Sequence, residues 1–197
     1  MGMSGSNVFA DDEMARQFCG YVLRGHFGLA DEISCRDCSA LTRYFYVSCT
    51  DRIVLKVISN YDVHVVNLEK VFQSSGNGDL MQGGCCDYLL YSDTRLVLAD
   101  LSCSRPNYVE KKRATAYRQT SDSIDKLRLF NDMAEKIECF ERRDAMLAVR
   151  KKEFALEHAD HAVESMSSFL RMELSPRVDM GNGFFFSVFE YPRELEM

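Results

Sequence analysis

The sequence has no long hydrophobic run, and no stretch approaches the roughly 18 apolar residues that a membrane-spanning helix needs. The first residues, MGMSGSNVFADDEM, lack a basic region followed by an apolar core, so we expect no secretory signal. Without an export signal, the eight cysteines are expected to be reduced thiols rather than disulfides. These absences predict a cytoplasmic protein that does not enter a membrane.

Positive charge is also scarce. The formal net charge is −6 and the isoelectric point is near 5.3. A protein that coats nucleic acid non-specifically needs a basic surface to neutralise phosphates, so the composition excludes that class. Two short basic stretches remain, VEKKRATAYR (109–118) and VRKKE (149–153). They leave open a local contact with nucleic acid or with a partner protein.

The usual patterns of a zinc site are incomplete. Cys35 and Cys38 form one CxxC pair, but no second CxxC pair exists to complete four ligands. His158 and His161 have a spacing that can chelate a metal on a helix, but the HExxH arrangement is absent. We therefore expect free or buried cysteines and a solvated polar strip in preference to zinc.

Motifs for nucleophilic catalysis and for nucleotide binding are absent as well. The chain has no GxSxG elbow, and its two GNG segments (76–78 and 181–183) do not continue into a Walker lysine. The two segments are predicted to be turns.

The residues that are present predict a single mixed α/β domain over 1–197, with a core at about 11–192. The chain is 46% hydrophobic and 27% charged, which is ordinary for a globular domain. The patterns predict helices at 11–29, 107–138 and 153–174, strands at 44–49, 52–59, 62–68, 86–91, 95–102 and 184–192, a loop at 73–84, and a turn at 179–183; residues 145–151 fit either a short strand or the end of a helical hairpin.

The aromatic strand FFFSVFEY (184–191) has two interpretations. Its rings could stack on nucleic-acid bases. Packing is the preferred interpretation, either in a strand buried on both faces or against a partner chain.

The stretch GCCDYLLYSDTRLVLADLSCS (84–104) carries one acid on each of two apolar runs. Asp87 begins the first run and Asp100 ends the second, with SDT as the turn between them. A tight hairpin brings both acids to its open end, side by side. Because an ionised carboxylate in an apolar environment needs a partner, this geometry suits a divalent cation such as Mg²⁺. Such a cation activates water in phosphodiester cleavage.

This arrangement resembles the PD-(D/E)xK, or restriction endonuclease-like, superfamily of nucleases. The resemblance covers roughly residues 50–130. It implies an α-β-β-β-α-β core, here with an extra C-terminal helix and strand. Asp87 matches the first acid of the motif, with Cys86 where proline often stands, and Asp100 matches the second acid. The implied cofactor is Mg²⁺, the implied partner is nucleic acid, and the family's habits extend to bacterial defence and mobile elements.

The sequence departs from the family at the motif lysine, where Ser102 stands. A serine hydroxyl is short and neutral and cannot supply the missing charge. In some members the lysine lies on the following helix, so Lys112 or Lys126 would replace it here. Gln119 lies where several members carry a glutamine that points into the site. Glu13 matches an additional acid that some members carry on the first helix.

Three hypotheses therefore remain for Asp87 and Asp100. They form a working Mg²⁺ site, or a decayed site in a nuclease-like fold, or a structural pair in an unrelated α/β domain. In the first case the protein is a metal-dependent nuclease, and in the second the decayed site leaves a binding or regulatory module in a nuclease-like fold. The function we expect is a nucleic acid-associated protein that is a degenerate or weakly active metal-dependent nuclease. The alternative is a non-catalytic protein-binding or regulatory module within a larger complex.

Overall fold

The protein is described here from a computed structural model, and eight strands of its described residues form one mixed sheet. The strand order is β1-β2-β3-β4-β5-β7-β6, and β8 pairs with β2. The predicted α/β class is confirmed. The structure describes residues 21–30, 53–75, 80, 82–104, 108–129, 133–151 and 177–197. Its elements are β1 (Tyr21–Ala30), β2 (Ile53–Asn67), α2 (Leu68–Ser74), β3 (Tyr88–Tyr91), β4 (Arg95–Ser104), α4 (Val109–Arg128), α5 (Met133–Glu138), β5 (Arg142–Lys151), β6 (Val178–Gly181), β7 (Phe184–Glu190) and β8 (Glu194–Glu196).

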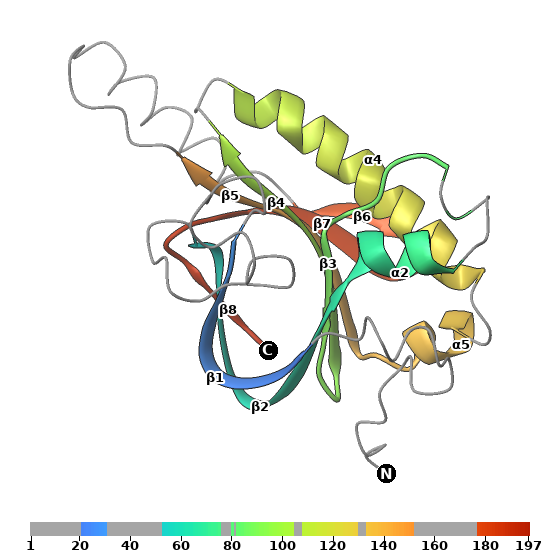
Figure 1. Cartoon of the computed structure of the whole chain (residues 1–197), viewed down its shortest axis with the longest axis horizontal. Helices are drawn as coiled ribbons and strands as arrows, with labels where there is room; N and C mark the ends of the chain where they lie inside the picture. The colour runs from blue at the N-terminus through green and yellow to red at the C-terminus, as the bar shows by residue number, and fades with distance from the viewer. Residues whose placement is uncertain are drawn as a thin grey trace.

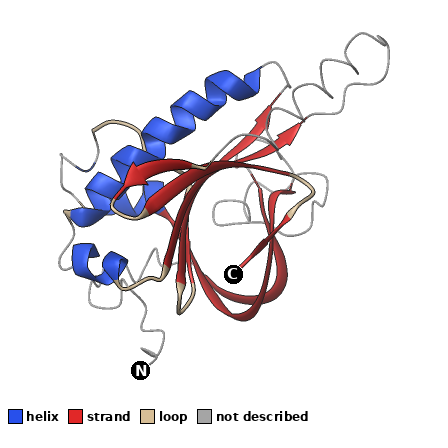
Figure 2. Cartoon of the chain, turned by 180° about the vertical axis from the view of Figure 1, so that it is seen from behind, coloured by secondary structure: helices blue, strands red, loops and turns tan. Residues whose placement is uncertain are grey.

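The three described helices lie on one side of the sheet, and the sheet curves strongly, with β1, β2 and β8 bending round on its other side (Figures 1 and 2). We call these sides the helix face and the concave face. Alternate side chains of β4 lie on the two faces, because successive side chains of a strand point to opposite sides of the sheet. Leu96 and Leu98 pack on the helix face, and Val97 and Ala99 pack on the concave face.

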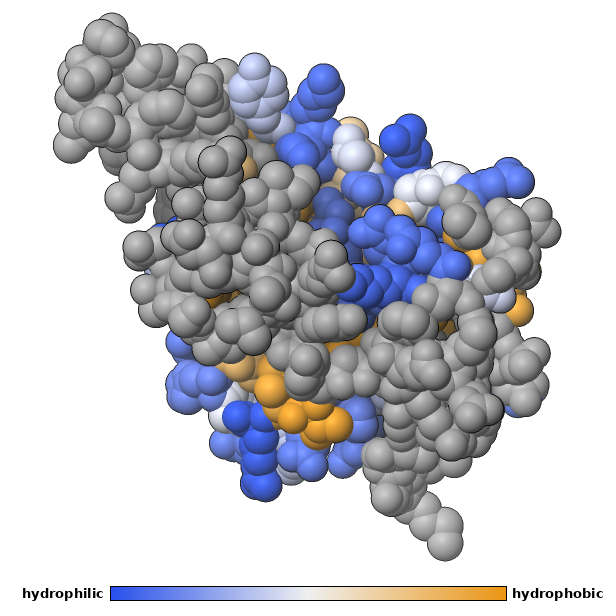
Figure 3. Space-filling view, in the orientation of Figure 1, coloured by the Kyte–Doolittle hydropathy of each residue, from blue (hydrophilic) through white to orange (hydrophobic). Residues whose placement is uncertain are grey.

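The outer surface around the helices is polar in the view of Figure 3, and apolar surface gathers in one patch low in the molecule. This fits α4, which buries Ala116, Ile124 and Leu127 and exposes its charged side. None of the helices within the described ranges is long and apolar enough to cross a membrane.

The predicted hairpin of 86–91 and 95–102 is confirmed as β3 and β4, which pair antiparallel. The turn between them is closed by Ser92, whose N–H donates to the carbonyl of Arg95 at 2.9 Å. Residues 145–151 belong to strand β5, which pairs parallel with β4 after the chain has crossed the helix face in α4.

The prediction of one helix over 11–29 is wrong for residues 21–29, which form β1. The spacing of Tyr21, Val22 and Leu29 suggested a helix. The burial instead alternates over residues 22–27, where Leu23 and Phe27 are partly buried and Val22, Arg24 and His26 are exposed, as a strand beside β2 requires.

The predicted separation of strands 52–59 and 62–68 is also wrong, because β2 runs through without a turn. Asn60 and Tyr61, which separated the two predicted strands, are exposed but lie in the middle of one continuous strand. The predicted loop at 73–84 is wrong in its first residues, because helix α2 extends to Ser74. This helix begins after Asn67, whose side chain accepts a hydrogen bond from the N–H of Lys70 at 3.0 Å.

The predicted helix 107–138 is divided into α4 and α5. The sequence between them contains Asn131 and Asp132, which favour a new helix start over continuation. The predicted strand at 184–192 is confirmed as β7 over residues 184–190, but the predicted turn at 179–183 is wrong for residues 179–181, which belong to β6. Strand β7 is not buried on both faces: Phe184 and Phe186 are buried, whereas Phe185 is 37% exposed. The predicted strand 44–49 and helix 153–174 lie outside the described residues.

Candidate functional site

Asp87 and Asp100 come together at the open end of the β3–β4 hairpin. The last residue pair of the hairpin is Tyr88 with Ala99, and the two acids follow directly on their strands, away from the turn. The alternation of side chains along β4 puts the carboxylate of Asp100 on the helix face, and Asp87 directly precedes β3. Asp100 is only 8% exposed, so its charge lies in a poorly solvated place.

The hydrogen bonds of Asp87 include one from its side chain and one from its backbone. Its Oδ2 accepts from the backbone N–H of Leu101 at 2.7 Å, and its backbone carbonyl accepts from the N–H of Leu68 at 3.1 Å. The first bond ties the side chain to β4 beside Asp100. The second ties the backbone of Asp87 to the first residue of α2. Asp87 thus stands where two strands and a helix meet.

The residues before Asp87 are held by α4. Gln119 Nε2 donates to the carbonyl of Cys85 at 3.1 Å, and Lys126 Nζ donates to the carbonyl of Gly84 at 3.0 Å. Between them on the helix, Ser123 Oγ accepts from the N–H of Cys86 at 2.9 Å. These three side chains are four and three residues apart and therefore share one face of α4.

Gly84 allows this close contact between backbone and helix. A Cβ at this position would lie 2.8 Å from Cγ of Gln119, which is closer than real Cβ atoms approach. The absence of a side chain is therefore what lets the segment lie against α4.

Several charged groups of this region influence the pKa of the Cys85 thiol. Burial raises the pKa of Cys85 to about 11, and the carboxylates of Glu69, Asp87 and Asp100 add to the increase. The ammonium group of Lys126 acts in the opposite direction. Three acids and one lysine thus influence a single half-buried thiol.

Lys126, rather than Lys112, is the lysine of α4 that contacts the segment leading to Asp87. Lys126 is 7% exposed, and its ammonium lies 5.3 Å from the ring centroid of Phe72. Lys112 is exposed and lies about 10 Å along the helix axis beyond Gln119, at 1.5 Å per residue. Ser102, in the position of the motif lysine, is buried on the same face as Asp100.

Two carboxylates on adjacent strands are a donor set that fits Mg²⁺, which is bound by one or two carboxylates and retains several waters. Within the described residues, no group of three or more His, Cys, Asp or Glu side chains gathers as a metal-binding cluster. Asp87 and Asp100 would therefore supply the protein's charged ligands, and a buried lysine beside them limits the local negative charge. Glu13, Cys35, Cys38, His158 and His161 lie outside the described residues.

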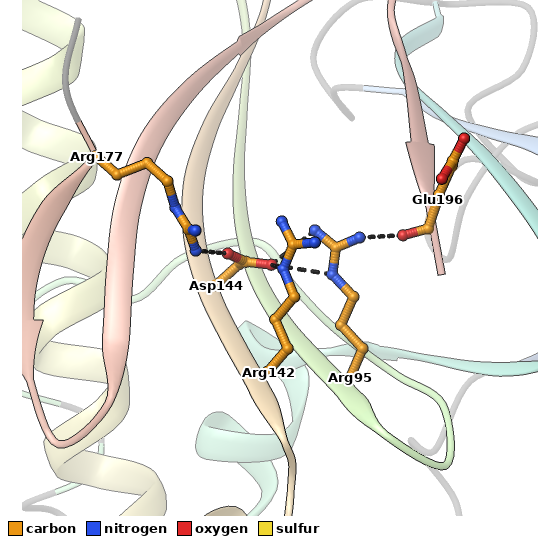
Figure 4. A network of polar contacts seen from close by, with 5 residues as sticks. All are labelled: Arg95, Arg142, Asp144, Arg177 and Glu196. Atoms are coloured by element: carbon orange, nitrogen blue, oxygen red, sulfur yellow. Dashed lines mark hydrogen bonds and ion pairs between the residues drawn. The ribbon is translucent and has the colours of Figure 1, made fainter.

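Sequence reasoning missed a second polar cluster, on the concave face. Asp144 of β5 accepts hydrogen bonds from Arg95, Arg142 and Arg177, which come from β4, β5 and the residue before β6 (Figure 4). Because Arg177 is 33 residues and Arg95 49 residues from Asp144, only the pairing of the strands brings them together. The doublet of arginines at 142–143 was the one local signal.

Comparisons with protein-family models, with curated proteins and with solved structures give no match to this chain.

Proposed function

We propose that this protein is a divergent PD-(D/E)xK-like, nucleic acid-associated protein with weak metal-dependent phosphodiesterase activity. The observation that carries the proposal is the placement of Asp87, Asp100 and the buried Lys126 around the open end of one hairpin. Two acids with a neighbouring cation on the next helix are the groups that such chemistry needs.

The order of elements supports the proposal. Strands β2, β3 and β4 form an antiparallel series, α4 crosses the helix face, and β5 returns parallel to β4. This corresponds to the β-β-β-α-β part of the expected core. The helix expected before it is not supported at residues 21–30, where β1 lies.

The residues have separate roles in the proposed reaction. Asp87 and Asp100 would hold Mg²⁺, which when bound supplies activation of water and stabilisation of the leaving oxygen. Lys126 provides the positive charge that Ser102 lacks. Gln119 positions the segment before Asp87 through its bond to Cys85.

The activity is expected to be weak, because Lys126 is already engaged. Its ammonium donates to the carbonyl of Gly84 and lies over the ring of Phe72. A lysine held in this way contributes charge at a distance but is constrained in reaching a substrate oxygen.

A second candidate function is a non-catalytic binding module, and one contact favours it. The bond from Leu101 N–H to Asp87 completes the hydrogen bonding of β4 where the short strand β3 has ended. A carboxylate with that role alone would be structural, and the surface around it would serve a partner protein.

Cleavage assays separate the two candidates. Labelled single-stranded and double-stranded DNA and RNA are incubated with the wild type in Mg²⁺ or Mn²⁺. Asp100→Asn is expected to abolish cleavage, and Lys126→Met to lower it by about 10²-fold or more, since removal of one charge-stabilising group costs that much in other enzymes. Lys112→Met is the matched control on the same helix and is expected to retain the wild-type rate.

The outcome depends on folding as well as on activity. Each variant is therefore first tested for an unchanged cooperative melt. A rate that falls equally in Lys112→Met and Lys126→Met would contradict the role of Lys126. A wild type that cuts none of the four substrates with either metal would favour the binding module.

A further inference from the structure

The arginine cluster of the concave face, defined as Arg95, Arg142 and Arg177 around Asp144, carries more positive charge than its carboxylate balances. Asp144 Oδ2 accepts from Arg95 Nη2 at 2.6 Å and from Arg142 Nε at 2.7 Å, and Oδ1 accepts from Arg177 Nη2 at 2.6 Å. Three guanidinium groups and one carboxylate leave two positive charges in a chain whose net charge is −6.

The excess positive charge affects the pKa of Arg95 within the cluster. Burial lowers the pKa of Arg95, Asp144 opposes that change, and the neighbouring charges of Arg142 and Arg177 lower the pKa further. Glu196 contributes its backbone carbonyl to Arg95, while its carboxylate points away from the cluster (Figure 4). An external anion would relieve this repulsion.

Two of the arginines are accessible to such an anion. The side chain of Arg142 is 54% exposed and that of Arg177 is 50% exposed, whereas Arg95 is 11% exposed. Arg142 and Arg177 each give one N–H to Asp144, so the carboxylate fixes their orientation and leaves the other N–H groups of each fork directed elsewhere. A guanidinium fork held in this way matches the oxygens of a phosphate group.

A row of aromatic rings continues from the arginine cluster along β7. Phe185, Phe189 and Tyr191 alternate along the chain and so belong to one face of the strand and its extension. Phe185 lies opposite Asp144 in the β5–β7 pairing. Each ring of this aromatic row has a cation over it: Arg177 over Phe185 at 4.8 Å, Arg193 over Phe189 at 5.1 Å, and Arg150 and Lys56 over Tyr191 at 4.3 and 5.0 Å.

We propose that the arginine cluster and the aromatic row form a binding surface for single-stranded nucleic acid, with Arg142 and Arg177 on backbone phosphates and Phe185 with its stacked arginine against a base. Surfaces of this class combine cations that follow the backbone with aromatic and guanidinium planes on which unpaired bases stack. A duplex keeps its bases stacked within itself and cannot use these planes. The surface is on the sheet face opposite Asp100, so it does not depend on metal binding there.

Binding of fluorescent oligo(dT) and oligo(U) of equal length tests the proposal, measured by anisotropy in EDTA at several salt concentrations. The double variant Arg142→Gln/Arg177→Gln leaves Arg95 to neutralise Asp144, and its melt is compared with the wild type. It is expected to weaken binding at least tenfold and to lower the slope of log affinity against log salt by about 1.4, because each phosphate contact contributes about 0.7. The control is the double variant Lys111→Gln/Arg118→Gln, which removes two positive charges from exposed positions of α4 and is expected to weaken binding less.

Phe185→Ala separates stacking from charge. It is expected to weaken binding several-fold without changing the salt slope, and Phe185→Tyr is expected to restore the affinity. EDTA also separates this test from the proposed phosphodiesterase, because loss of cleavage at Asp100 leaves binding to this surface intact.

Several results would overturn the proposal. They are equal weakening by the α4 double variant, equal affinity for a duplex of the same length, or equal affinity for a glutamate-rich peptide. Saturation of the surface by inorganic phosphate with no gain from the oligonucleotides would identify a small-anion site instead.

Discussion

At the residue scale, the account depends on a few charges placed where water is scarce. Asp100 and Lys126 are both less than 10% exposed, and each would be costly alone. Cys85 lies among them, so its thiol reports the charges of the site without any substrate.

The pKa of Cys85 provides the first test at this scale. With a pKa of about 11, only about one hundredth of the thiol is ionised at pH 9, so its alkylation is expected to be slow there. Lys126→Met removes the one charge that lowers this pKa and is expected to raise it further. Asp100→Asn is expected to lower it. Alkylation by iodoacetamide as a function of pH, resolved by peptide mass spectrometry, measures all three.

The direction in which the pKa of Cys85 changes on addition of Mg²⁺ shows whether the nearby carboxylates bind the metal. Bound Mg²⁺ would neutralise the nearby carboxylates, so it is expected to lower the pKa of Cys85 in the wild type and not in Asp100→Asn. An ordinary pKa near 9 in all variants would show that the charges do not influence this thiol.

At the element scale, short segments hold the site from three directions. Helix α4 holds residues 84–86, β4 holds the side chain of Asp87, and α2 brings Glu69 and Phe72 to the same region. Helix α2 has only seven residues, so its stability depends strongly on how it begins.

The cap of α2 gives a prediction at this scale. Asn67→Ala removes the acceptor for the N–H of Lys70 and is expected to cost about 1 kcal/mol in the free energy of unfolding. Asn67→Asp keeps the acceptor and is expected to cost less. Asn60→Ala, the same change at an exposed position of β2, is the control and is expected to stay within about 0.5 kcal/mol of the wild type. Urea unfolding measures each value. Equal losses for Asn60→Ala and Asn67→Ala would contradict the cap.

At the scale of the whole molecule, the sequence predicted those features that contacts between residues close in the chain determine. The hairpin around Asp87 and Asp100 followed from two apolar runs and a turn of three polar residues. Strand β1 was missed because Tyr21, Val22 and Leu29 fit a helix as well as a strand, and only pairing with β2 decides between them. The arginine cluster required the register of β4 with β5 and of β5 with β7, which no local spacing contains.

In the candidate site, too, some residues were predictable from the sequence and one choice required the structure. Asp87, Asp100, Gln119 and Lys126 were all singled out in the sequence, because the order of strand, turn, strand and helix constrains their positions. The choice between Lys112 and Lys126 was not decidable from spacing, since both lie seven residues from Gln119. The segment at Gly84 decides it, through its contact with Lys126.

A thermal melt with Mg²⁺ or Mn²⁺ tests the central claim most directly, namely that Asp87 and Asp100 hold a divalent cation. At a metal concentration of 100 Kd, binding to the folded state adds about 2.7 kcal/mol, which corresponds to a rise in Tm of about 5–10 °C for a chain of this size. We predict this rise in the wild type and in Asp125→Asn, an exposed control on α4, and its absence in Asp100→Asn. No rise in the wild type, or an equal rise in Asp100→Asn, would contradict the metal site.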